Sequence, residues 1–117
     1  MNEHQEQVAV VEWFRLQYPK HILFAIPNGG ARHIVTAVNL KREGVISGVP
    51  DLFVMYPAFP FHGLFIEMKA KGGKVSPAQK EFMAAAIDNG YQASVCYGFD
   101  EAREAINLYL HCANSSV

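Results

Sequence analysis

Two apolar runs in the middle of the chain, residues 51–56 and 63–69, constrain the fold more than any other feature. Together they are rich in Leu, Ile, Val and Phe, and only a short segment containing Pro57 and Pro60 separates them. Runs of this length and composition between turn-forming residues are typical of β-strands. We therefore predict two adjacent strands that pair as a hairpin.

Patterns typical of helices and of further strands lie on both sides of this hairpin. Residues 3–18 repeat apolar side chains at helical spacing, and Ser76-Pro77 offers an N-cap and a first-turn proline for a helix that ends near Asp88. Two more helices are predicted over 31–43 and 100–111, and two more strands over 21–26 and 91–97. This order predicts an α/β fold in which helices flank a mixed central sheet.

The length of 117 residues suits one hydrophobic core, so we predict a single domain over residues 1–117. No apolar run is long enough to cross a bilayer and the first residues lack a signal-peptide pattern, which predicts a cytoplasmic protein. The net charge is −1, but residues 32–80 carry seven Lys or Arg against three Asp or Glu. A local basic excess of this kind is compatible with binding to phosphate groups.

Three charged residues stand in the otherwise apolar runs. Asp51 opens the first run, and Glu67 and Lys69 interrupt the second. Burial of such charges is unfavourable unless an opposite charge or a metal ion compensates for it. Side chains alternate faces along a strand, so Glu67 and Lys69 point to the same side, and pairing of the two strands would bring Asp51 close to Glu67.

Two carboxylates and an ammonium group at one point favour metal-assisted hydrolysis of a phosphodiester. Asp51 and Glu67 supply hard oxygen ligands for Mg²⁺, and the main-chain carbonyl of Met68 is a further candidate ligand. A bound ion would polarise the phosphate, while Lys69 would orient the attacking water and offset charge in the transition state. The alternative interpretation is an ordinary ion pair between Glu67 and Lys69 on a half-exposed strand.

The spacing of these residues resembles the core of PD-(D/E)xK nucleases, in which an Asp precedes a Glu-x-Lys strand. Pro50-Asp51 is followed after one hairpin by Ile66-Glu67-Met68-Lys69. Longer segments are similar to the VRR-NUC family, and together they extend over nearly the whole chain: Glu3–Gln7, Pro27–Gly30, Gly48–Leu52 and Gly72–Gln79.

The resemblance implies a restriction-endonuclease-like core and a stand-alone nuclease domain of the phage or bacterial type. It also implies dependence on Mg²⁺ or Mn²⁺, action on structured or branched DNA such as Holliday junctions or flaps, and a homodimer, with no membrane and no organic cofactor. Two other functions stay open. One is a catalytically weak or inactive nucleic-acid-binding module of the same fold, and the other is a restriction-type enzyme that reads base sequence.

Further site residues follow from the same resemblance. The first helix of such folds contributes a carboxylate, and among Glu3, Glu6 and Glu12 the helical stripe favours Glu3, with Glu6 second. Gln79 matches the family's glutamine after the Glu-x-Lys strand and would orient a water molecule or a phosphate oxygen. Basic residues that flank the proposed site are candidates for phosphate contacts: Arg32, Lys71 and Lys74.

The glycine-rich segment Asn28–Gly30 is interpreted first as a turn that needs positive φ, and second as a loop that contacts DNA. The five histidines show no spacing typical of a zinc site. Three aromatic residues are assigned to the core: Trp13, Phe24 and Phe65.

Overall fold

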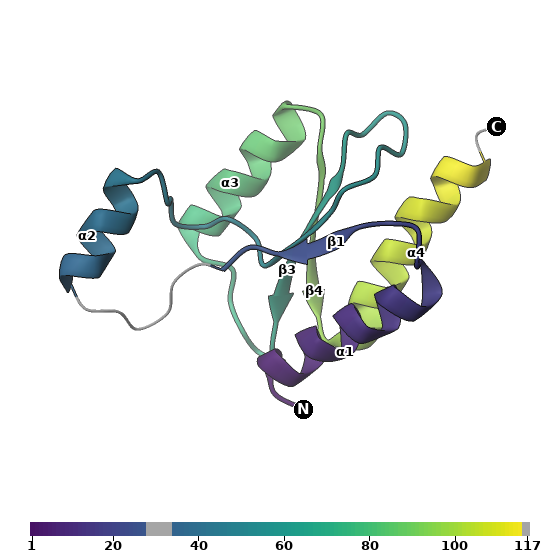
Figure 1. The fold of residues 1–117 in the computed structure, drawn as a ribbon, viewed down its shortest axis with the longest axis horizontal. Helices are drawn as coiled ribbons and strands as arrows, with labels where there is room; N and C mark the ends of the chain where they lie inside the picture. The colour runs from purple at the N-terminus through teal and green to yellow at the C-terminus, as the bar shows by residue number, and fades with distance from the viewer. Residues whose placement is uncertain (28–33, 116–117) are drawn as a thin grey trace.

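The computed structural model describes residues 1–27 and 34–115 (Figure 1). Within these ranges the elements are, in order, α1 (Glu3–Gln17), β1 (Leu23–Ala25), α2 (Ile34–Arg42), β2 (Leu52–Val54), β3 (Leu64–Lys69), α3 (Pro77–Asp88), β4 (Gln92–Tyr97) and α4 (Phe99–Ser115). The predicted order of helices and strands is confirmed. The predicted turn at Asn28–Gly30 and the candidate Arg32 lie outside the described residues. No helix in the described ranges combines the length and the apolar character needed to span a membrane.

The strands form a four-stranded sheet in the order β1-β2-β3-β4. β1 pairs with β2, and β2 with β3, in antiparallel register, so the predicted hairpin is confirmed, with Leu52 opposite Ile66. β3 and β4 run parallel, because α3 crosses over between them, and Glu67 lies opposite Val95. The result is the mixed sheet that the sequence predicts.

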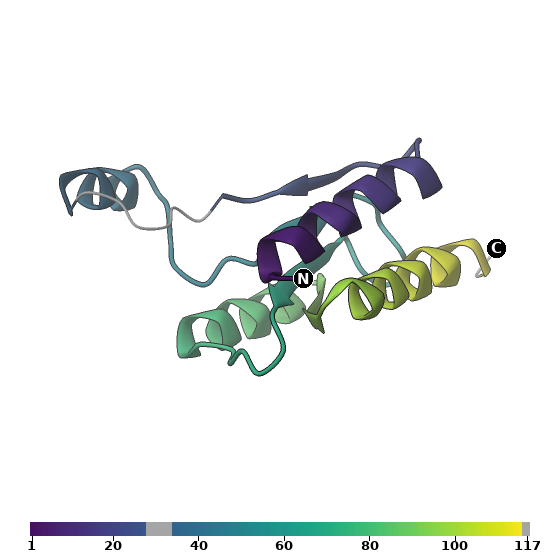
Figure 2. The same ribbon diagram turned by 90° about the horizontal axis from the view of Figure 1, so that it is seen from below.

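The core lies on one face of this sheet, under α1 and α4. These two helices run side by side (Figures 1 and 2). Alternate strand residues face them, and the members of the core that are at most 1% exposed are Val10, Phe14, Leu52, Val54, Leu64, Ile66, Met68, Ala102, Ile106 and Leu110. Burial of each large apolar side chain contributes roughly 1.5–3 kcal/mol to folding, so this face supplies most of the hydrophobic stabilisation.

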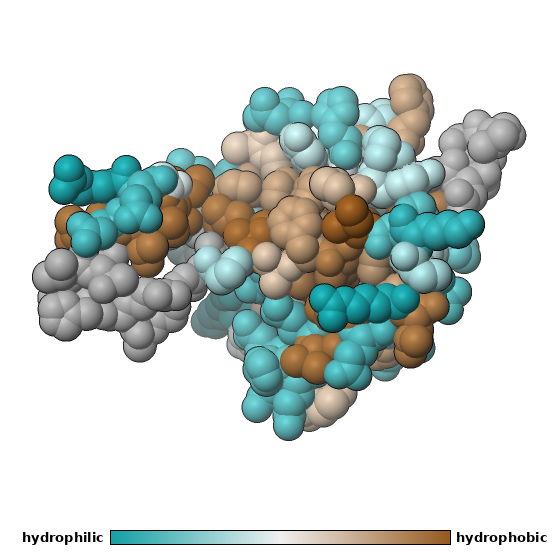
Figure 3. All heavy atoms as spheres, viewed as in Figure 1, coloured by the Kyte–Doolittle hydropathy of each residue, from teal (hydrophilic) through white to brown (hydrophobic). Residues whose placement is uncertain are grey.

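The opposite face of the sheet is covered only in part, by α3. The rings of Phe65 on β3 and Phe82 on α3 meet edge to face with their centroids 5.3 Å apart. β1 lies at the sheet edge, and Phe24 on this strand is 44% exposed. The assignment of Phe24 to the core is therefore wrong, because α3 packs near β4, at the opposite edge of the sheet from β1. Figure 3 shows apolar side chains in the middle of the molecule, where Figure 1 draws β1.

α2 stands apart from the other helices. Figures 1 and 2 place it at one end of the long axis of the molecule, which measures 49 Å. Val38 on this helix is 53% exposed, and Val45 and Ile46 after it are 40% and 57% exposed. Residues 34–47 therefore form a projecting arm, which is called the arm below.

The start of α3 is fixed by a capping box around Ser76. The Ser76 hydroxyl accepts the N–H of Gln79 at 3.1 Å, and the Gln79 side-chain oxygen accepts the N–H of Ser76 at 2.8 Å. A cap of this kind stabilises a helix by about 0.5–2 kcal/mol. Its second effect is to hold the side chain of Gln79 close to the end of β3.

Candidate active site

A cleft of about 780 Å³ opens where β2 begins and β3 ends. Its apolar wall comes from the arm and includes Leu40, Val45 and Ile46. The polar and charged side chains that line it come from distant parts of the chain: Glu3, Lys41, Ser47, Asp51, Glu67, Lys69 and Gln79. The cleft thus gathers all the catalytic candidates that the sequence analysis proposed.

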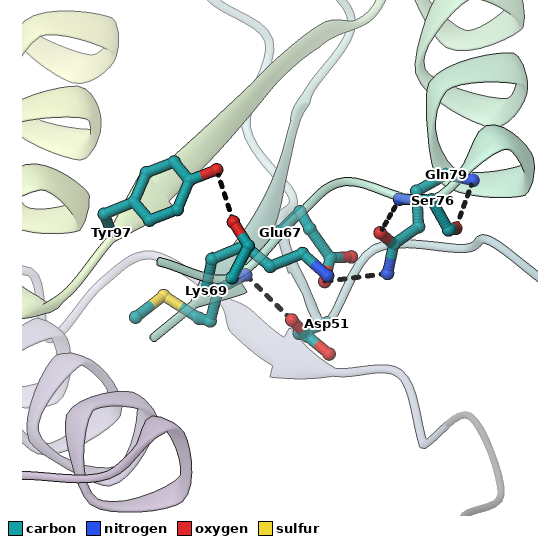
Figure 4. A network of polar contacts seen from close by, with 8 residues as sticks. Asp51, Glu67, Lys69, Ser76, Gln79 and Tyr97 are labelled. Carbon is teal, nitrogen blue, oxygen red and sulfur yellow. Dashed lines mark hydrogen bonds and ion pairs between the residues drawn. The ribbon is translucent and has the colours of Figure 1, made fainter. Parts of the chain in front are cut away.

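Glu67 lies at the centre of this group, on β3, and is only 3% exposed. Its Oε2 lies 3.7 Å from Nζ of Lys69 and accepts a hydrogen bond from Nε2 of Gln79 at 3.2 Å (Figure 4). The predicted common face of Glu67 and Lys69 is confirmed by this contact. Gln79 reaches Glu67 because the capping box uses only its oxygen and leaves the amide nitrogen to donate.

Asp51 ties the start of β2 to the end of β3. Its Oδ2 accepts the N–H of Met68 at 2.8 Å, across 17 residues of sequence (Figure 4). The Met68 side chain is fully buried on the core face, so its backbone lies between the core and the cleft. This hydrogen bond fixes the Asp51 carboxylate beside the residue that follows Glu67.

The pKa of Glu67 is raised from 4.5 to about 8. Burial of the carboxyl group is the main cause, and the charge of Asp51 together with a hydrogen bond to it adds to the rise. The charge of Lys69 lowers this pKa, while that of Glu3 raises it slightly. Without a further cation, burial and the charge of Asp51 therefore both favour the protonated form of Glu67, and the charge of Lys69 offsets them only in part.

The acidic pair has donor atoms that could hold a divalent cation. The Asp51 and Glu67 carboxyl groups interact directly, and the charge of Asp51 disfavours ionisation of Glu67. A divalent cation would offset this charge, and carboxylate oxygens are ligands that suit Mg²⁺ and Mn²⁺. Among the described residues, no group of three or more His, Cys, Asp or Glu side chains is arranged to hold a metal ion. The fit therefore rests on two carboxylates, which suits Mg²⁺ because this ion keeps several of its waters.

The structure separates the three glutamates of α1. Glu3 lines the cleft, whereas the Glu6 carboxylate accepts the N–H of Phe99 and so caps the start of α4. Glu12 lines a different hollow along α1, together with Arg15, and does not line the cleft; Glu3 lines both. Only Glu3 therefore lies where a helix carboxylate would reach the site, although it is exposed.

Basic residues around the site have different positions. Lys71 and Lys74 are exposed on the loop between β3 and α3, and neither lines the cleft. Lys41 does line it, from α2 on the arm. The sequence analysis did not select Lys41 as a site residue, because nothing in its local pattern shows that α2 faces the carboxylates.

Gly48 is a second residue that the sequence analysis did not select for the site. It adopts a φ of +89°, and a Cβ atom at this position would lie 2.3 Å from the carbonyl oxygen of Ala78 at the start of α3. Only glycine permits such a close approach of two backbones. The contact joins the segment before Asp51 to the helix that carries Gln79.

A mixed sheet that presents an acidic pair and a lysine at its strand ends defines the class of PD-(D/E)xK nucleases. The model of the VRR-NUC domain matches residues 1–100 of the chain. The chain therefore belongs to the VRR-NUC family, and membership of this family indicates a nuclease that acts on nucleic acid.

A solved structure described as a "VRR_NUC domain protein" is similar to this chain. The two are 30% identical and superpose with a TM-score of 0.83, over 96% of this chain and 90% of the other. No curated protein matches the chain. The structural similarity confirms the predicted α/β fold with its mixed sheet and flanking helices.

Proposed function

We propose that this protein is a divalent-cation-dependent endonuclease that hydrolyses phosphodiester bonds in structured or branched DNA. The observation that carries the proposal is the buried Glu67 carboxyl group, whose raised pKa comes partly from Asp51 beside it. A single domain over residues 1–117 would hold the complete site. The proposed location is the cytoplasm of a bacterium or of a phage-infected cell.

Asp51 and Glu67 would hold Mg²⁺ or Mn²⁺, with the Met68 carbonyl as a further ligand. When bound, this ion supplies polarisation of the scissile phosphate and a lower pKa for an attacking water. The hydrogen bond from the Met68 N–H to Asp51 supports this assignment, because it restricts the Asp51 carboxylate to one orientation.

Lys69 orients the attacking water and offsets negative charge that develops on the phosphate. Gln79 fixes the rotamer of Glu67 through its amide nitrogen, which is 3.2 Å from Oε2. Glu3 adds a negative charge at the rim of the cleft, where it accepts a proton or orients a water. These roles require no rearrangement of the fold.

Phosphate contacts on either side of the scissile bond are assigned to basic residues near the cleft. Lys41 contributes from the arm, and the exposed loop after β3 contributes Lys71 and Lys74. Arg32 remains a proposed contact from the sequence analysis. The arm extends the binding surface beyond the sheet, which supports a bent or branched substrate more than a straight duplex.

A homodimer is proposed together with a branched substrate, since a two-fold axis would present two sites to two strands of a junction. A junction, a flap and a linear duplex of matched sequence separate structure-guided cutting from base-sequence reading. Faster cleavage of the junction or flap is the expected result. Equal cleavage of all three would contradict this part of the proposal.

The proposal is tested by incubating a nicked or branched DNA with the purified protein in Mg²⁺, in Mn²⁺ and in a chelator. Cleavage is expected only with the cations, and Asp51→Asn should abolish it. Asp88→Asn, at the exposed end of α3, is the matched control and should cleave normally. DNA binding without cation-dependent cleavage would instead identify an inactive binding module.

A further inference from the structure

We infer that Tyr97 is a positioning residue for Lys69: its hydroxyl group fixes the Gly73 backbone, and this backbone confines the Lys69 side chain beside Glu67. The inference rests on the proposed catalytic function of Lys69. It assigns a function to a residue that touches neither the carboxylates nor the cleft, and that acts only through the loop between β3 and α3.

Lys69 and Tyr97 occupy matching positions at the ends of two neighbouring strands. They are partners in the parallel register of β3 and β4, so their side chains leave the sheet on the same face. Figure 4 shows Tyr97 extending from its strand toward the loop that follows Lys69. The N–H of Tyr97 donates to the carboxylate of Glu101 at 2.9 Å, which fixes the backbone from which the ring projects.

The Tyr97 hydroxyl group donates a hydrogen bond to the carbonyl oxygen of Gly73 at 2.9 Å (Figure 4). On its other side, the N–H of Gly73 donates to the carbonyl of Ala70 at 2.8 Å and closes a tight turn directly after β3. Both polar groups of Gly73 are therefore engaged, one by the turn and one by Tyr97. The hydrogen bond from the Tyr97 hydroxyl group thus joins this turn to the end of β4.

Gly73 lies next to the stem of the Lys69 side chain. A Cβ atom on Gly73 would be 3.0 Å from the Ala70 carbonyl oxygen and would reach ordinary contact distance, 3.6 Å, from Cδ of Lys69. The Lys69 side chain is only 13% exposed, so the groups around it limit its freedom. A lysine has many rotamers, and a backbone fixed next to its stem excludes some of them.

Confinement of the stem has a direct effect on the ammonium group. Nζ of Lys69 lies 3.7 Å from Oε2 of Glu67, which is longer than a strong hydrogen bond. The direction of the stem, more than this ion pair, therefore decides where the positive charge lies. Loss of the Tyr97 hydroxyl group would free the turn and broaden the positions of that charge.

Tyr97→Phe tests the inference because it removes one oxygen atom and keeps the ring. We expect kcat to fall about threefold to tenfold, because a less confined Lys69 ammonium group would stabilise the transition state less, with KM nearly unchanged. Tyr91→Phe is the matched control, because its ring packs among Phe53 and Phe65. The effect of Tyr97→Phe should vanish in a Lys69→Met background.

A second measurement does not depend on cleavage. The ¹³Cε relaxation of Lys69, assigned by comparison with Lys69→Arg, should show greater mobility in Tyr97→Phe and no change in Tyr91→Phe. Unchanged Lys69 mobility, or an unchanged kcat in a cleaving enzyme, overturns the inference. A wild-type protein that cleaves no DNA contradicts the proposed function alone, because the mobility measurement still decides the positioning.

Discussion

Ile66 and Glu67 are neighbours on β3 and both are buried, yet they lie on opposite faces of the sheet. Ile66 is 0% exposed and packs in the apolar core under α1 and α4. Glu67 is 3% exposed and has Asp51, Lys69 and Gln79 around it. Burial alone therefore does not distinguish the core from the site; the polarity of the neighbours does.

β3 contributes one set of side chains to the core and the alternate set to the candidate site. Alternation of side chains assigns Leu64, Ile66 and Met68 to the core and leaves Phe65, Glu67 and Lys69 for the site face. The core face is closed by two helices, whereas α3 covers part of the site face in the described part of the chain (Figure 1). Substitutions on the core face should therefore lower stability, and substitutions on the site face should lower the rate of cleavage.

Glu67→Gln should have the largest effect, on the site face. We expect cleavage to slow by at least about a hundredfold, because the cation loses a charged ligand. Thermal stability should be equal or higher, because a neutral amide replaces a carboxyl group whose ionisation is unfavourable there. Single-turnover cleavage and thermal melting measure the two quantities.

Glu81→Gln, on the exposed side of α3, is the control for this change and should alter neither quantity. Cleavage by Glu67→Gln within tenfold of the wild type would remove the functional distinction between the two faces.

Ile66→Ala should produce the opposite result on the core face. We expect a loss of about 2–5 kcal/mol in the free energy of unfolding, because the substitution leaves a cavity in the close-packed core. Cleavage per folded molecule should change little, since the site residues point the other way. Urea titration and an assay corrected for the folded fraction measure both.

The conservative variant Ile66→Val should cost only about 0.5–1.5 kcal/mol. A large loss of activity in fully folded Ile66→Ala would show that the two faces are coupled more tightly than alternation suggests.

The stability of the cation-free protein should depend on pH through Glu67. A folded-state pKa of about 8 against 4.5 means that the folded protein binds the proton more tightly, so this contribution to stability is full below pH 4.5 and is lost as the pH rises through 8. The melting temperature should therefore fall as the pH rises from about 4.5 to about 8, by roughly 5 °C or more. Thermal melts in a chelator measure it.

Mg²⁺ should reverse this trend, because the cation competes with the proton, and its stabilising effect should grow up to about pH 8. Glu67→Gln is the control and should lack this component of the pH dependence. An equal slope in both proteins would show that Glu67 does not titrate in this range.

Gln79→Ala should have the smallest effect and should lower both stability and activity. The loss of the capping box costs about 1 kcal/mol, and the loss of the donor to Glu67 slows cleavage several-fold. Ser76→Ala removes the cap and keeps the amide group, so it should lower stability by a similar amount with little effect on the rate. Equal rates in the two variants would show that the contact with Glu67 has no function in cleavage.

Local patterns were sufficient for much of the fold and for the centre of the site. Alternation within one strand placed Glu67 and Lys69 together, and the hairpin brought Asp51 beside them, because few residues separate the two strands. The N-cap at Ser76 was also visible in the sequence, since capping depends on residues three apart. The catalytic functions of these residues remain predictions.

Contacts between distant segments were not predictable in the same way. Glu6 caps α4 across 93 residues, and Tyr97 reaches Gly73 across 24, so neither pairing has a local signal. The exposure of Phe24 depends on where α3 packs, and the position of Lys41 depends on the direction of the arm. An apolar pattern shows which face of an element avoids water, but not which element covers it.

The contact of Gly48 with Ala78 has a consequence for mutational screens. A single methyl group at position 48 would push apart the two segments of the candidate site, one carrying Asp51 and the other carrying Gln79. A screen that ranks variants by lost activity would thus place substitutions of Gly48 beside substitutions of a metal ligand, although glycine has no functional side chain. Spectroscopy or a crystal structure of the variant would show that activity is lost because the two segments are displaced.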